Sequence, residues 1–144
     1  MNQIAPLEIG IAVKDLDLMV DFYQQVFACE EVRRADIPAQ LSSQIGVAKD
    51  GYVNVWLKFP GGEIVKFVKP PEPPKRDEQP SFMADKAGVA YFTIYCDAIG
   101  EAIAEAEALG ATLVSERALA EQGDGLKLAF LRDPEGNAFE FVQP

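Results

Sequence analysis

Three ionisable residues, Glu8, Lys66 and Glu140, could do acid–base or ligand-anchoring chemistry, because each interrupts an otherwise apolar predicted strand. Side chains alternate between the two faces of a strand, so a residue between two apolar residues that pack on a helix faces away from that helix. The three therefore share the predicted open face. Two carboxylates beside an ammonium would shift each other's pKa values, as in an active site, but an inert ion cluster fits the same residues.

Aromatic and apolar residues are predicted around this charged floor. Trp56 and Phe130 occupy matching positions in two similar strands. Alternation in the strand near 89–94 is predicted to place Thr93 toward a helix and Phe92 and Ile94 on the open face. Trp56, Phe92, Ile94 and Phe130 would then be ligand-binding residues of a small-molecule cleft, although plain core positions are the alternative.

Several chemistries are excluded by residues that the chain lacks. It contains no histidine, which removes Ser-His and Cys-His pairs and every metal site that uses imidazole. Cys29 and Cys96 have no CxxC spacing, so we predict two reduced structural thiols. The glycines at 60–62 and 134–136 lie between predicted strands and indicate hairpin turns, not nucleotide-binding loops.

A repeated module must position these residues. Residues 51–70 align without a gap to 125–144, and seven of the twenty positions are identical. The identities predict a strand, a tight turn and a second strand in each copy. Upstream, both copies read as a strand, an aspartate (Asp15 or Asp97) and an amphipathic helix, with Asp15 placed as a helix cap.

The two copies predict an α+β fold of two β-α-β-β-β modules in one domain of 144 residues. We expect modules at about 5–70 and 88–144, joined by a Pro-rich linker at 70–88, with helices outside and curved mixed sheets enclosing a cleft. The two aspartates stand further apart in the chain than the two hairpins do, so the first module is the longer one. Its extra residues lie within about Pro38–Asp50, the expected rim of the cleft.

The charge and hydrophobicity of the chain limit the kinds of molecule that it is expected to bind. A net charge of −10, from 13 basic and 23 acidic residues, argues against nucleic acid as a partner. An acidic surface favours cationic small molecules, although solubility is the commoner reason for such a charge. No apolar run is long enough to span a bilayer, and the N-terminal residues lack the layout of a signal peptide, so we predict a cytoplasmic protein that does not bind membranes.

Two segments, IGIAVKDLDLMVDFYQQVF and DPEGNAFEFVQP, resemble the opening strand and helix and the closing strand of the vicinal oxygen chelate superfamily. That group holds glyoxalases, bleomycin-resistance proteins and extradiol dioxygenases. The resemblance covers both modules. It implies the predicted fold and a homodimer, which a monomeric mass by light scattering would contradict, and it leaves open whether modules pair within one chain or between two.

Metal enzymes of that superfamily place their ligands on the first and last strand of each module. The resemblance matches those positions to Glu8, Lys66, Ala90 and Glu140. Ala90 cannot coordinate and Lys66 is itself a cation, so we predict no metal and no cofactor. The ammonium of Lys66 would instead stand between the two carboxylates and offset the cost of burying them.

Two functions follow from the resemblance, and the residues leave open whether the chain is an enzyme. One is metal-free binding of a small aromatic or cationic molecule, as in resistance or sequestration proteins. The alternative is a glyoxalase-like isomerase, epimerase or lyase that uses Glu8 or Glu140 as base with Lys66. The sequence does not identify the small molecule.

Overall fold

The computed structural model describes residues 1–75, 79–114, 120–121, 123 and 125–144. The chain divides into two compact units, Met1–Arg76 and Asp77–Pro144, which correspond to the two modules. Residues 76–78 of the predicted linker lie outside the described ranges, and the prediction of one shared domain stays a prediction. No helix in the described ranges is long and apolar enough to cross a bilayer.

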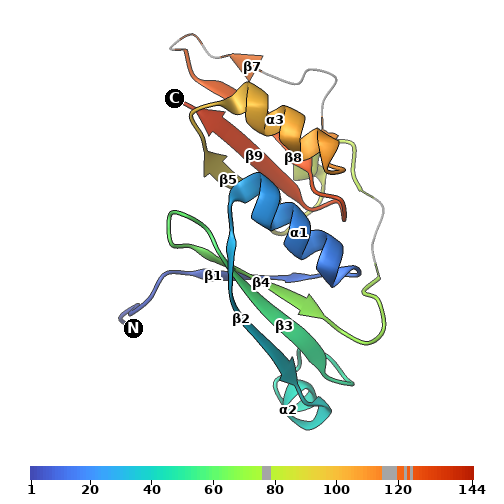
Figure 1. Ribbon diagram of the computed structural model, residues 1–144. Helices are drawn as coiled ribbons and strands as arrows, with labels where there is room; N and C mark the ends of the chain where they lie inside the picture. The colour runs from blue at the N-terminus through green and yellow to red at the C-terminus, as the bar shows by residue number, and fades with distance from the viewer. Residues whose placement is uncertain (76–78, 115–119, 122, 124) are drawn as a thin grey trace. The chain divides into compact units, whose positions relative to one another are not determined.

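The first module is a four-stranded mixed sheet with one long helix on one face (Figure 1). Its strand order is β1-β4-β3-β2, with β1 parallel to β4 and the other neighbours antiparallel. In chain order its elements are β1 (Glu8–Ala12), α1 (Leu16–Phe27), β2 (Glu30–Ile37), α2 (Ala39–Gln44), β3 (Tyr52–Lys58) and β4 (Ile64–Lys69).

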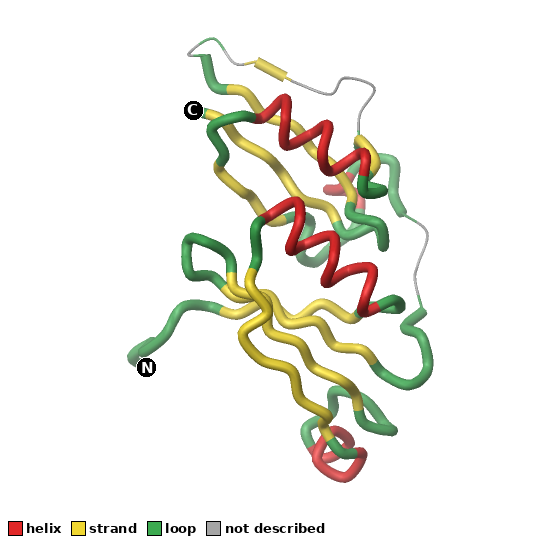
Figure 2. Tube along the Cα trace, in the orientation of Figure 1, coloured by secondary structure: helices red, strands yellow, loops and turns green. Residues whose placement is uncertain are grey.

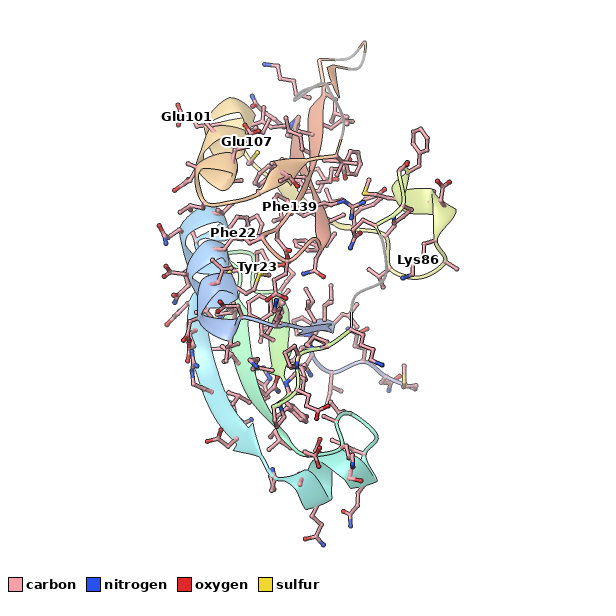
Figure 3. The ribbon with its side chains drawn as sticks, turned by 90° about the vertical axis from the view of Figure 1, so that its right-hand side faces the viewer. Phe22, Tyr23, Lys86, Glu101, Glu107 and Phe139 are labelled. Atoms are coloured by element: carbon pink, nitrogen blue, oxygen red, sulfur yellow. The ribbon has the colours of Figure 1, made fainter. Side chains whose placement is uncertain are left out.

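Apolar residues at strand and helix spacing build the core between this sheet and α1. Val65 and Phe67 are buried and alternate with more exposed neighbours on β4, as predicted. Tyr23 of α1 (labelled in Figure 3) is fully buried. Its ring centroid lies 4.7 Å from that of Phe67. The carboxylate of Asp15 accepts a hydrogen bond from the Leu18 N–H at 3.1 Å and caps α1, also as predicted.

The extra residues of the first module form a short protrusion between β2 and β3, within the predicted segment. It contains α2 and a loop that Ser42 fastens: its buried hydroxyl donates to the Ala48 carbonyl at 2.6 Å and accepts from the Ala48 N–H at 3.1 Å. At Gly51 (φ 83°) a Cβ atom would lie 2.6 Å from the Ile37 carbonyl oxygen, so glycine is required there. Its role as a rim stays a prediction.

The second module repeats this plan with shorter elements (Figure 2). Its strand order is β5-β9-β8-β6, with β5 parallel to β9, and β7 also pairs with β8. Its elements are η1 (Met83–Asp85), β5 (Phe92–Tyr95), α3 (Ile99–Ala108), β6 (Thr112–Leu113), β7 (Ala120–Glu121), β8 (Lys127–Arg132) and β9 (Ala138–Gln143). The predicted α+β fold of two similar modules is therefore confirmed.

The closing hairpins of the two modules share one turn. The Phe59 N–H donates to the Glu63 carbonyl at 2.8 Å, and the Asp133 N–H donates to the Asn137 carbonyl at 2.9 Å. The equivalent glycines of the two turns, Gly62 and Gly136, both have a positive φ, 104° in one and 88° in the other. The identities between residues 51–70 and 125–144 thus mark equivalent backbone positions.

The opening strand of the second module lies one position later than predicted. Ile9 pairs with Val65 and Phe92 pairs with Phe139, and Val65 and Phe139 are equivalent in the two hairpins. Phe92 is therefore the equivalent of Ile9, whereas the alignment of the two aspartates had matched Ile9 to Tyr91. A slip of one position exchanges the two faces of a strand, so the predicted faces of β5 were wrong.

The helices confirm the corrected register, because Leu16 begins α1 as far beyond Ile9 as Ile99 begins α3 beyond Phe92. Ala98, not Asp97, is the N-cap of α3, and it supplies no capping side chain. The Ile99 N–H donates instead to the side-chain oxygen of Gln143 at 3.0 Å. The alignment of the two modules had matched Asp97 to the helix cap Asp15, because aspartate is a common residue at a helix start.

Candidate functional site

A row of four residues crosses the open face of the first sheet. Gly10 of β1 lies beside Lys66 of β4, Lys66 beside Trp56 of β3, and Trp56 beside Arg33 of β2. The residues before and after Lys66 and Trp56 are Val65, Phe67, Val55 and Leu57, which are buried in the core. Lys66 and Trp56 therefore face away from the core, as the alternation predicted.

Two of the three predicted catalytic residues meet in this module. The Lys66 ammonium lies 3.1 Å from a Glu8 carboxylate oxygen, and the two side chains are 32% and 37% exposed. An ion pair this exposed is screened by water, so it is weaker than the buried charged floor that the sequence predicted. The pair still fixes an ammonium at the centre of the open face.

Arg33 completes the row and was missed by the sequence analysis. Its guanidinium carbon lies 4.6 Å from the centroid of the Trp56 ring, a cation–π contact. Strand alternation would put Glu31 and Arg33 on the same face, but the register shifts between them. This bulge sends Glu31 to the side of Leu57 and Arg33 to the side of Trp56, and nothing in the run EEVRR signals it.

The third predicted catalytic residue, Glu140, belongs to the second module. It faces away from the core, since its neighbours Phe139 and Phe141 are buried. The Thr93 hydroxyl of β5 donates a hydrogen bond of 2.6 Å to its carboxylate. Thr93 was assigned to the wrong face, although the polarity of β5, with Thr93 and Tyr95 against Phe92, could have corrected that assignment.

The ligand-binding roles predicted for Phe92 and Ile94 rest on the same error. Both share the face of their partners Phe139 and Phe141, which are core residues. The Phe92 ring stacks on that of Phe139, with centroids 6.0 Å apart and planes at 26° (Phe139 is labelled in Figure 3). These two side chains therefore line the core side of the second sheet.

Tyr91, which precedes Phe92, takes the place that the prediction gave to Ala90. In the corrected register it is the equivalent of Glu8. Its ring centroid lies 4.9 Å from that of Phe130, which pairs with Glu140 and shares its open face, as predicted. In the corrected register, the four positions that the resemblance matches to the family's metal ligands are Glu8 and Lys66 in one module and Tyr91 and Glu140 in the other.

Neither cysteine is activated as a nucleophile. Both thiols are free. Burial raises the pKa of the Cys29 thiol to about 12, and burial also raises the pKa of Cys96. Because the thiolate is the reactive form, both side chains are neutral and weakly nucleophilic near pH 7.

The described residues hold no cluster of three or more histidine, cysteine, aspartate or glutamate side chains arranged to bind a metal ion. The groups that they do hold on the two open faces include an ammonium bound to a carboxylate, a guanidinium over an indole ring, and a carboxylate bound to a hydroxyl near a pair of aromatic rings. Such groups can orient a small planar molecule or exchange a proton with it.

Known proteins resemble this chain in sequence and in fold. Lactoylglutathione lyase GLX1 of Arabidopsis thaliana is 28% identical over 137 residues, which is 95% of this chain but 43% of that protein. The chain thus spans less than half the length of the curated relatives that it matches.

Among solved structures, a glyoxalase family protein of Bacillus cereus superposes with a TM-score of 0.83 at 16% identity, covering 99% of this chain and 95% of that one. Glyoxalase I of Zea mays superposes with a TM-score of 0.70 at 22% identity, covering 97% of this chain and 44% of that one. At these identities the likeness shows the fold.

The sequence profile of one family extends over nearly the whole chain, from residue 3 to residue 141, and so covers the first module and all but the last residues of the second. The repeat, the mixed sheet of each module and this match agree, and the chain belongs to the Glyoxalase/Bleomycin resistance protein/Dioxygenase superfamily.

Proposed function

We propose that this protein binds a small aromatic or cationic molecule without a metal ion, using the open face of the first sheet. The observation that carries the proposal is the ion pair of Lys66 and Glu8, 3.1 Å long. The resemblance matches these two positions to metal ligands of the family's enzymes. The positive charge that a metal supplies elsewhere is here part of the chain.

The donor set does not fit a divalent metal. The Lys66 ammonium has no lone pair to donate and repels cations, and it already occupies the Glu8 carboxylate. In the second module the equivalent of Glu8 is the phenol Tyr91, and the carboxylate of Glu140 accepts a hydrogen bond from Thr93. One carboxylate and one phenol are a poor match to the three or four nitrogen, sulfur or carboxylate ligands of zinc.

Trp56 supplies the surface on which a planar ligand would lie. An indole offers a large apolar face for stacking and a quadrupole that attracts cations. On the far side of Lys66 from Trp56, a Cβ atom added at Gly10 would have no heavy atom within 4 Å, so the glycine leaves open space next to Lys66. These features support binding of a small molecule whether or not a reaction follows.

A second candidate is catalysis of a glyoxalase-like isomerisation, epimerisation or lyase reaction. It is favoured by the 28% identity to a lactoylglutathione lyase and by the exposed carboxylates of Glu8 and Glu140. The Glu8 carboxylate could take a proton from a carbon next to a carbonyl group, and Lys66 of the same sheet could stabilise the negative charge that develops on the oxygen. No metal enters this scheme.

Elemental analysis of protein purified without chelator tests the proposal. We expect no stoichiometric zinc, nickel, iron or manganese, and an unchanged melting temperature after added metal salts, because a bound metal would stabilise the fold. About one metal ion per chain would overturn it. Incubation with S-lactoylglutathione, and separately with glutathione and methylglyoxal, tests the second candidate: turnover in either direction that Glu8→Gln or Glu140→Gln abolishes would favour the enzyme.

A further inference from the structure

We propose that the first module selects a planar aromatic carboxylate that carries a hydrogen-bond donor at its far end. This inference rests on the proposed function, since it names the class of molecule that would bind at Trp56. Three groups carry it: the guanidinium stacked on Trp56, the ammonium of Lys66, and a buried acceptor, the side-chain oxygen of Asn54.

The charges next to Trp56 are positive, although the chain as a whole carries −10. Lys66 and Arg33 are its direct neighbours on the two flanking strands. By the sheet register the open face carries three basic and two acidic residues: Arg33, Lys58 and Lys66 against Glu8 and Glu30. A ligand on the Trp56 ring therefore meets cations first, which disfavours a cationic ligand and favours an anionic one.

Arg33 is the group best placed to bind that anion. Within the described part of the chain its guanidinium contacts the Trp56 ring and forms no ion pair, whereas the Lys66 ammonium is bound to Glu8. A guanidinium that lies over a ring still presents its N–H groups along its edge, and this edge matches a carboxylate in a two-bond fork. Arg33 thus offers a site that can bind a ligand carboxylate beside the Trp56 ring, on which the rest of the ligand can stack.

Asn54 adds a second requirement for the ligand. It lies on the same face of β3 as Trp56, one alternation earlier in the strand, and is 6% exposed. Its side-chain oxygen is the one buried side-chain oxygen or nitrogen of the described residues that has no hydrogen-bond partner. An unsatisfied buried acceptor costs about 1–3 kcal/mol. Since the oxygen has less than 1 Å² of accessible surface, a ligand hydroxyl would satisfy it by displacing the side chains that cover it, and a buried water is another donor that could do so.

The spacing of these groups sets the size of the ligand. Arg33 pairs with Trp56, so Arg33 and Asn54 are diagonal neighbours on adjacent strands. Diagonal neighbours lie about 7–8 Å apart, within reach of long side chains. A bicyclic aromatic acid with a hydroxyl group opposite its carboxylate spans such a distance. A suitable probe of this shape is 6-hydroxy-2-naphthoate.

The single tryptophan of the chain reports binding at the site itself. In protein labelled with nitrogen-15, the indole N–H of Trp56 gives one signal, whose shift can be followed while probes are added. Three probes share one ring system and differ in charge: 2-naphthoate, 2-naphthamide and 2-naphthylmethylammonium. We expect 2-naphthoate to bind about tenfold more tightly than 2-naphthamide, as for a hydrogen-bonded charge pair, and the ammonium probe most weakly.

Neighbouring arginines provide matched variants. Arg33→Gln should abolish the preference for 2-naphthoate over 2-naphthamide, and Arg33→Lys should restore it in part, because lysine keeps the charge without the fork. Arg34→Gln makes the same change in charge on the other face of β2, where Arg34 pairs with Glu31 at 2.8 Å. It should leave the preference intact.

A second pair of probes tests whether the site requires a hydrogen-bond donor on the ligand to reach Asn54. We expect 6-hydroxy-2-naphthoate to bind about three to ten times more tightly than 6-methoxy-2-naphthoate, and Asn54→Ala to remove this difference. Equal binding of the two would overturn the donor requirement and leave the oxygen to a water molecule.

The outcomes separate this inference from the proposed function. If the neutral or cationic naphthalene shifts the Trp56 signal at the lowest concentrations, the site binds aromatic molecules but does not select acids, so the inference fails and the proposed function stands. If none of the five probes moves the Trp56 signal at millimolar concentration, the aromatic site itself is refuted, and both fail.

Discussion

The two closing hairpins share one backbone turn but stabilise it with opposite chemistry. In the first module the turn begins at Phe59, whose ring stacks on Phe27 with centroids 5.7 Å apart. In the second it begins at Asp133, which is 3% exposed. One of its carboxylate oxygens accepts from the N–H groups of Glu135 and Asn137 at 3.0 and 2.9 Å, and the other accepts from the Asn137 side chain at 2.8 Å.

This difference teaches that the repeat preserves backbone geometry and leaves side chains free to diverge. The turn needs its backbone hydrogen bond and a glycine with positive φ, and both modules keep them. The residue that begins the turn can then attach it to an aromatic cluster or to a polar network. The same freedom explains why equivalent positions on the open faces hold an ammonium in one module and a carboxylate in the other.

The largest expected effect tests the polar turn. Asp133→Ala removes the acceptor of two backbone N–H groups in a buried setting, so we expect a loss of about 3 kcal/mol in the free energy of unfolding, measured with urea. Asp133→Asn keeps one acceptor oxygen and should lose about half as much. A loss below about 1 kcal/mol for Asp133→Ala would mean that the backbone turn persists without the carboxylate.

The next effect tests the corrected register of β5. Phe92→Ala should cost about 2 kcal/mol, because Phe92 packs on Phe139 on the core side of the sheet but is not fully buried. Tyr95 is 72% exposed on the opposite face, and Tyr95→Ala should change stability by less than about 0.5 kcal/mol. The reverse order would show that the strand pairs one position earlier, as the sequence comparison predicted.

The sequence predicted the fold well where the repeat is long and its apolar residues alternate. The hairpins satisfy both conditions, so the faces of Lys66, Trp56, Phe130 and Glu140 were predicted correctly. The strand β5 satisfies neither, since it has four residues and no charged side chain to mark its outer face. Matching Asp97, which directly precedes the true N-cap, to Asp15 then placed the alignment of the two modules in the wrong register.

The site was predicted less completely, because its remaining residues depend on irregular structure. Arg33 reaches Trp56 only through the bulge after Glu31, and Thr93 meets Glu140 only in the corrected register. The exposure of a charged pair also cannot be predicted from alternation. Alternation assigns a side chain to a face but does not say how deeply that face is covered.

The smallest expected effect concerns Lys66, where the two modules differ most. Lys66 and Glu8 are each about one-third exposed, so water screens their attraction, and pairs of this kind contribute about 0.2–1 kcal/mol. We therefore expect Lys66→Ala to lower the free energy of unfolding by no more than about 1 kcal/mol. A double-mutant cycle with Lys66→Met and Glu8→Gln isolates the pair, and Lys58→Ala, on the same face, controls for loss of a surface charge.

A larger loss would change the interpretation of the whole open face. If Lys66→Ala cost about 3–5 kcal/mol, as for breaking a buried ion pair, the ammonium would have to be shielded from water in solution, as the sequence alone suggested. Because Glu8 leaves it one-third exposed, that shielding would have to come from groups beyond the pair, either a bound molecule or another part of the protein. Repeating the measurement with saturating 2-naphthoate would separate these sources. If a ligand that contacts Lys66 provides the shielding, Lys66→Ala should lower the free energy of unfolding more with 2-naphthoate present than without it.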